Sequence, residues 1–97
     1  MATSKISTPI NNVLSRSSTS VLTFAKNQPK GGVCFYATVG SAPDNPDEKS
    51  YFFIIYSNED TAICILAIGN GSREMYLNTS TNSGTTWGGW KAVTMSA

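Results

Sequence analysis

The side chains of this chain that are suited to chemistry are aromatic rings set beside hydroxyl and amide groups. Trp87 and Tyr76 flank one turn, which contains Asn82 and Thr85. Sugars bind by stacking their apolar faces on aromatic rings while hydroxyls and amides satisfy the polar edge. Arg73 would add a cation for an anionic sugar. The sequence therefore predicts a glycan-binding surface made of these five residues, and the alternative is that Trp87 caps its own hairpin. The other large rings considered are Tyr36, Tyr51 and Trp90, of which Trp90 is expected in the core.

Catalysis is not predicted, because the chain contains no histidine, the commonest general base and metal ligand. A glycosidase needs two carboxylates facing each other across a cleft, whereas Glu59 and Asp60 share one expected hairpin loop. Asp44, Asp47 and Glu48 are a candidate weak calcium site. Their spacing matches no calcium-binding loop, so a solvated loop is the preferred interpretation. We predict no enzyme activity, no metal and no cofactor.

The two cysteines, Cys34 and Cys64, lie in separate apolar runs. The N-terminus lacks the apolar region of a signal peptide, so we expect synthesis in the cytosol. Reducing conditions there favour free thiols that pack as small hydrophobic side chains. A disulfide between them stays open as the alternative.

Two unbroken apolar runs, residues 51–56 and 62–68, decide the expected architecture. A strand with one wet face alternates polar and apolar side chains, and neither run alternates. No amphipathic helical stretch is evident to cover them, so their second face must pack on a second sheet or on identical subunits. The remaining expected strands are 21–25, 33–39, 73–79 and 90–95, separated by turns rich in Gly, Asn and Pro. The predicted fold is all-β: an antiparallel β-sandwich of short strands, packed as a homo-oligomer.

The turn before Trp87 has a recognisable pattern. Residues 80–87 read Ser-x-Asn-x-Gly-x-Thr-Trp, which resembles the Asp-box hairpin of sialidase propellers, with Asn82 where that motif usually has Asp. A hairpin tip needs positive φ, which Asn82 and Gly84 are expected to supply. Propellers repeat the box once per blade, and this chain carries one copy. The motif therefore predicts a hairpin, and a sialidase-like hydrolase is disfavoured.

A wider pattern begins with the aromatic run 31–37, the Pro-rich stretch 42–46 and the apolar run 51–56. It ends with Tyr76, polar residues, and a Gly-Thr-Thr-Trp turn followed by Trp90-Lys91. In this order the segments resemble phage tail-fibre and R-type pyocin knob domains over roughly residues 20–95. The resemblance implies a homotrimeric tip that binds bacterial cell-surface polysaccharide and joins the remainder of a tail fibre. Weak single sites gain strength when several tips engage one surface.

Composition and charge restrict the partners. The net charge is +1 and the seven basic residues are scattered, which argues against nucleic acid. No apolar run reaches the length of a bilayer span, so no membrane insertion is expected. Residues 1–17 are expected to be an N-terminal tail or lead-in, and residues 18–97 a knob-like β domain.

The function expected from these observations is a non-catalytic receptor-binding tip of a phage-type tail fibre, recognising bacterial surface glycan. Its expected location is the virion, after synthesis in the host cytoplasm without a signal peptide. The alternative is a structural virion or tail component, such as a fibre cap or adaptor, with no glycan site. Exposure of Trp87 beside a groove would favour recognition, and burial would favour a structural part.

Overall fold

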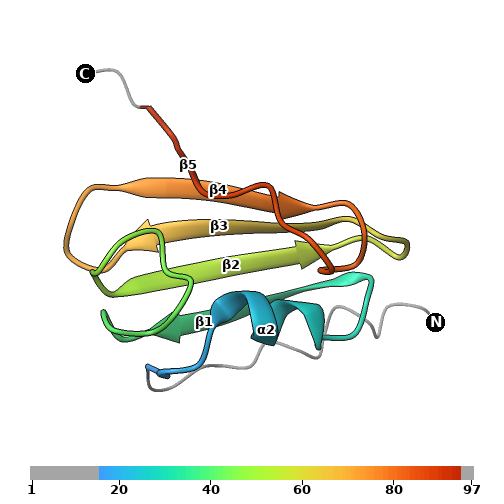
Figure 1. Ribbon diagram of the computed structural model, residues 1–97, viewed down its shortest axis with the longest axis horizontal. Helices are drawn as coiled ribbons and strands as arrows, with labels where there is room; N and C mark the ends of the chain where they lie inside the picture. Colours follow the sequence, from blue (N-terminus) through green and yellow to red (C-terminus); the bar gives the residue numbers. More distant parts are fainter. Residues whose placement is uncertain (1–15, 95–97) are drawn as a thin grey trace.

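The computed structural model describes residues 16–94, which form one antiparallel sheet with a short helix beside it (Figure 1). The five strands lie across the sheet in chain order, β1-β2-β3-β4-β5. The elements are α2 (Val21–Lys26), β1 (Gly32–Thr38), β2 (Tyr51–Ser57), β3 (Ile63–Gly69), β4 (Met75–Ser80) and β5 (Lys91–Ala92). The expected antiparallel, mainly β character is therefore confirmed, and β1 to β4 lie where strands were predicted.

The prediction of a strand over residues 21–25 is wrong, because this segment is α2. Ser20 caps the helix: its Oγ accepts hydrogen bonds from the backbone N–H of Leu22 at 3.1 Å and Thr23 at 3.3 Å, as N-cap serines commonly do. Val21 and Ala25 are four residues apart, share one helix face and are buried. A helix of six residues is not stable alone, so packing against the sheet stabilises it, which sequence periodicity could not reveal.

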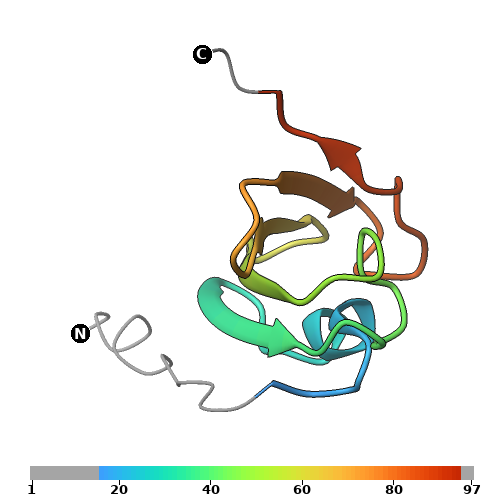
Figure 2. The same ribbon diagram turned by 90° about the vertical axis from the view of Figure 1, so that its left-hand side faces the viewer.

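One side of the sheet, here called the covered face, holds the hydrophobic core. In Figure 2, which looks along the strands, α2, the loop after β1 and the segment before β5 all lie on this side. The buried apolar residues are Val21, Ala25, Tyr36, Tyr51, Phe53, Ile55, Ile63, Ile65 and Ala67. Around them pack the half-buried Leu22, Phe24, Cys34, Tyr76, Trp87 and Trp90.

The opposite side, here called the bare face, is also apolar, but none of the helix or loops just named lies over it (Figure 2). By strand register its apolar residues on β1 to β4 are Val33, Phe35, Ala37, Phe52, Ile54, Tyr56, Cys64, Leu66, Ile68, Met75 and Leu77, and Thr79 is polar. Burial therefore alternates along β2 and β3 even though their sequences do not. The unbroken apolar runs produce one buried apolar face and one partly exposed apolar face.

A second sheet, as a sandwich requires, is not present among residues 16–94. The second layer over the covered face consists of α2 and loops. Two residues of the expected tail touch the domain: Arg16 donates to Ser50 Oγ at 3.3 Å, and Ser17 forms a parallel bridge with Thr38. Residues 1–15, the rest of that tail, lie outside the described residues.

Candidate functional site

The hairpin turn between β4 and β5 is held by its own side chains. Ser80 Oγ accepts from the backbone N–H of Asn82 at 3.3 Å and of Gly84 at 2.9 Å, and donates to Asn82 Oδ1 at 2.9 Å. Asn82 Oδ1 also accepts from the Thr86 N–H at 2.9 Å, while its Nδ2 donates to Thr86 Oγ1 at 2.8 Å. Such side-chain bonds to nearby backbone are typical of turns. Asn82 therefore organises the turn, and both atoms of its amide are engaged within it.

The positive φ predicted at Gly84 is confirmed, with a value of 86°. The prediction of positive φ at Asn82 is wrong, because the second such angle of this turn is at Ser83, with φ of 60°. Asn82 stabilises the turn through its side chain instead. A Cβ on Gly84 would lie 2.6 Å from Lys26 Cβ, so the turn packs directly on the end of α2 and only glycine fits there.

Three segments meet at this end of the sheet. Lys30 Nζ donates to the Asp60 carbonyl at 2.8 Å and to Ser83 Oγ at 3.1 Å. The Ser83 N–H donates to the Thr61 carbonyl at 2.9 Å. The hairpin turn is therefore hydrogen-bonded to the loop between β2 and β3 and to the turn after α2. These bonds fix the position of its exposed residues.

The two tryptophans differ in their surroundings. The Trp90 ring lies 5.9 Å from the Phe53 ring, and its Nε1 donates to the Asp44 carbonyl at 2.8 Å. Trp90 thus packs against the core with its polar atom satisfied. Trp87 is half-buried at the margin of the same core. The Trp87 side chain is less exposed than a ring that stacks freely on a sugar and more exposed than a core residue.

The remaining predicted site residues lie on or beside β4 and are not all together. Tyr76 is half-buried, and its ring meets the ring of Tyr51 edge-on at 6.0 Å. Arg73 is exposed before the start of β4, whereas Asn82 and Thr85 are exposed after its end. A six-residue strand separates these positions by roughly 20 Å. Arg73 therefore does not share a binding surface with the hairpin turn.

Two rings considered from the sequence are core residues. Tyr36 is stacked on Phe24, with ring centroids 4.1 Å apart, and its hydroxyl donates to the Thr19 carbonyl at 3.0 Å. Tyr51 is 0% exposed. Neither can stack on a ligand from solution.

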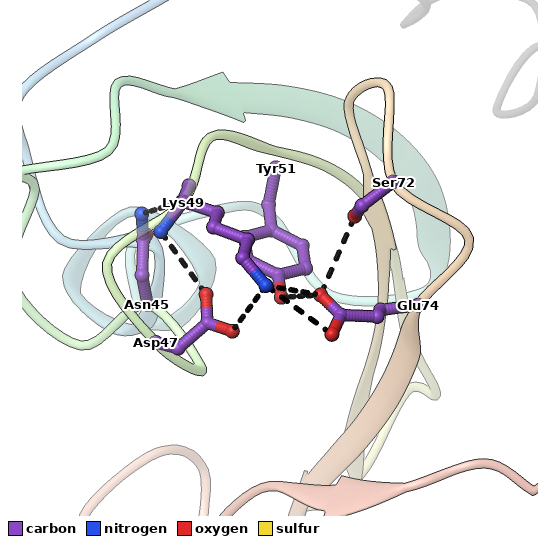
Figure 3. Close-up of polar contacts among 6 residues, drawn as sticks. All are labelled: Asn45, Asp47, Lys49, Tyr51, Ser72 and Glu74. Atoms are coloured by element: carbon purple, nitrogen blue, oxygen red, sulfur yellow. Dashed lines mark hydrogen bonds and ion pairs between the residues drawn. The ribbon is translucent and has the colours of Figure 1, made fainter.

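A polar cluster at the other end of the sheet was not predicted from the sequence (Figure 3). Lys49 Nζ lies 3.1 Å from Glu74 Oε1 and 3.8 Å from Asp47 Oδ2. The hydroxyls of Tyr51 and Ser72 each donate to Glu74 Oε1 at 3.4 Å. The only available signal was strand register: pairing Tyr51 with Gly69 places the start of β2 beside the turn that carries Glu74.

The surroundings of this cluster favour one protonation state. Burial raises the pKa of Tyr51 above its ordinary value, and the neighbouring carboxylates of Asp47 and Glu74 raise it further because they would repel a tyrosinate. The hydrogen bond to Glu74, followed by the charges of Glu74 and Asp47, raises the pKa of Lys49. The cluster therefore holds a neutral tyrosine and a charged lysine, which suits a structural tie between the loop before β2 and the turn after β3.

Two of the three carboxylates of the candidate calcium loop face protein donors. Asp44 Oδ2 accepts from Ser20 Oγ at 2.6 Å, and Asp47 faces Lys49. Within residues 16–94 no group of three or more His, Cys, Asp or Glu side chains is placed to hold a metal ion. The two carboxylates instead hold the loop after β1 against α2 and β2.

The cysteines are free and half-buried in the structure. They lie on opposite sides of the sheet, Cys34 on the covered face and Cys64 on the bare face. Burial raises the pKa of the Cys34 thiol. The prediction of free thiols agrees with this arrangement, since a sheet separates the two sulfurs.

No family model matches this chain, and no curated protein or solved structure matches it either. The only helix of the described residues, α2, has six residues and is far too short to cross a bilayer.

Proposed function

We propose that this chain is a non-catalytic receptor-binding tip domain of a phage-type tail fibre that recognises a bacterial cell-surface glycan. The resemblance of its motifs to tail-fibre and pyocin knob domains suggests this class. It also suggests a homo-oligomer, a trimer in that family, attached to the remainder of a fibre and carried on the virion after synthesis in the host cytoplasm.

The observation that carries the glycan part of the proposal is the self-braced hairpin turn beside Trp87. Its internal hydrogen bonds and its tie to Lys30 hold the exposed Asn82 and Thr85 in place. A rigid polar surface next to a partly exposed indole suits a sugar, because little entropy is lost on binding. The amide of Asn82 is already engaged, so Thr85 and Trp87 are the stronger ligand candidates. Tyr76 and Arg73 belong to a separate area near the start of β4.

A titration of bacterial surface polysaccharides, followed by tryptophan fluorescence, tests the proposal. Trp87→Phe keeps a ring at the core margin and removes the indole, so we expect affinity for a bound polysaccharide to fall about tenfold. Trp90→Phe is the matched control, since Trp90 packs on Phe53, and it should leave affinity unchanged. Thr85→Ala should weaken binding without altering the fold.

A structural role in the virion is the second candidate, and a specific observation favours it. Trp87 packs against the core, and both atoms of the Asn82 amide are hydrogen-bonded within the turn. If no polysaccharide changes the fluorescence of the wild-type protein, a fibre cap or adaptor without a glycan site becomes the better account.

A further inference from the structure

The bare face carries no charged side chain on β1 to β4. Thr79 is its one polar residue, opposite Cys64, and every other position facing this way is apolar. An antiparallel sheet with a solvated face ordinarily carries polar residues there. These four strands lack polar residues there except for Thr79, and large exposed apolar patches of soluble proteins commonly mark interaction sites.

The most exposed apolar side chains of the described residues belong to this face. Tyr56 is 50% exposed, Val33 45%, Leu77 43% and Phe52 39%. They are spread over three strands and joined by less exposed neighbours, including the Phe35 ring, which lies 5.9 Å from the Phe52 ring. The patch is therefore continuous from β1 to β4.

The bare face is a large apolar surface for a small domain. Four strands of six or seven residues make a face of about 20 Å by 20 Å, on the order of 400 Å² in flat area. This is in the range of the largest apolar patches of soluble monomers, which are often functional. It is about half of the roughly 800 Å² that each partner contributes to a standard stable interface.

We propose that the bare face packs against the bare face of other copies of this chain. The absence of charge on β1 to β4 leaves the centre of the face without complementarity for an acidic or basic partner, and Lys91 of β5, which pairs with Leu77, adds one cation at its margin. Two flat apolar sheets are complementary to each other. Sheets pack face to face about 10 Å apart with interdigitated side chains. The sandwich that the sequence predicts within one chain would then form between chains.

The proposal gives the homo-oligomer of the proposed function a definite surface, and it rests on assembly but not on glycan binding. Face-to-face packing of two sheets pairs two copies, instead of the three that the resemblance suggests. The covered face with Trp87 and the hairpin turn lies on the other side of the sheet. Each copy would therefore turn its candidate glycan surface outward, away from its neighbours. Several weak sites on one assembly could then engage a bacterial surface together.

The test is the solution mass of the full chain by light scattering, with charge placed on the bare face. Wild-type protein should have a mass of at least twice 10.4 kDa. Tyr56→Lys should raise the dissociation constant at least about 30-fold and give a monomer, since it places a charge in a desolvated contact. Leu77→Lys should act in the same way at the β4 side of the face. Both side chains are partly exposed in the protomer, so circular dichroism should show an unchanged fold.

Thr23→Lys is the control, because Thr23 is exposed on α2 on the opposite side of the sheet, and it should leave the mass unchanged. A monomeric wild type at about 100 μM would overturn the proposal, because mM affinities are too weak for a stable assembly. That outcome would point to residues 1–15 of the same chain as the cover. Unchanged oligomers in both Tyr56→Lys and Leu77→Lys would also overturn it. A protein that assembles as expected but binds no polysaccharide would leave this proposal standing and remove the glycan proposal alone.

Discussion

Phe52 and Phe53 are neighbours in β2, yet Phe53 is 0% exposed on the covered face and Phe52 is 39% exposed on the bare face. The same contrast separates Ile65, which is fully buried, from Leu66, which is half-buried. In most sheets the sequence itself distinguishes the two faces by alternation. Here the residue types are alike on both faces, and the difference lies in what crosses the sheet. Residues of the same chain lie over the covered face, whereas α2 and the loops that cross the sheet leave the bare face open.

The largest expected effect compares these two phenylalanines directly. In a Tyr56→Lys background, where assembly should be removed, Phe53→Ala should lower the free energy of unfolding by about 3–5 kcal/mol because it leaves a cavity in the core. Phe52→Ala in the same background should cost about 1 kcal/mol. Urea unfolding measures both. Equal losses would mean that the two faces are equally buried within one protomer, contrary to the comparison.

The next prediction concerns the hairpin turn, which lies on the covered face and which Asn82 stabilises. Asn82→Ala removes three hydrogen bonds of the hairpin turn and should lower stability by about 1–2 kcal/mol. Asn82→Asp is the matched control, since a carboxylate keeps the acceptor and the Thr86 hydroxyl can turn to donate to it. Thermal unfolding of both variants, with light scattering, should show lost stability in Asn82→Ala and unchanged assembly in both. A change in oligomer mass would show that the hairpin turn belongs to the interface.

The smallest effect concerns the polar end of the covered face. Burial raises the pKa of Tyr51 in the folded state, so the unfolded chain loses the phenolic proton first as the pH rises. The stability due to this group is therefore fully present below the unfolded pKa of about 10 and is lost above it. Unfolding free energies measured from pH 8 to 11 should fall less steeply for Tyr51→Phe than for wild type. An identical slope in wild type and Tyr51→Phe would contradict the burial of Tyr51.

Strands β1 to β4 could be predicted from the sequence because their apolar and β-branched runs are bounded by strong turn residues. Helix α2 could not, since Val21–Lys26 has strand-like composition and is helical only because Ser20 caps it and the sheet packs beneath it. The need for a second covering layer was visible in the unbroken runs 51–56 and 62–68. The sequence did not show which face lacks that layer, because this depends on where α2 and the loops cross the sheet.

The candidate site was predictable only in part. The hairpin turn was visible because Ser80, Asn82 and Gly84 have a recognisable spacing, although positive φ was assigned to Asn82 instead of Ser83. Arg73 was grouped with the turn on residue type, and the length of β4 separates them. The contact between Lys49 and Glu74 joins residues that are 25 positions apart, and it follows only once the register of β2 and β3 is known.

The most direct test of the two-face account uses the two cysteines as reporters, one on each face. Wild-type protein is treated with a maleimide at high and at low protein concentration, and mass spectrometry measures the modification rate at each thiol. The account predicts that Cys64 is protected at high concentration and reacts about tenfold faster on dilution or in Tyr56→Lys, because its cover is another copy. Cys34, which packs against the core within the protomer, should react at one rate throughout. A Cys64 that reacts at the same rate at every concentration and in both proteins would contradict the account.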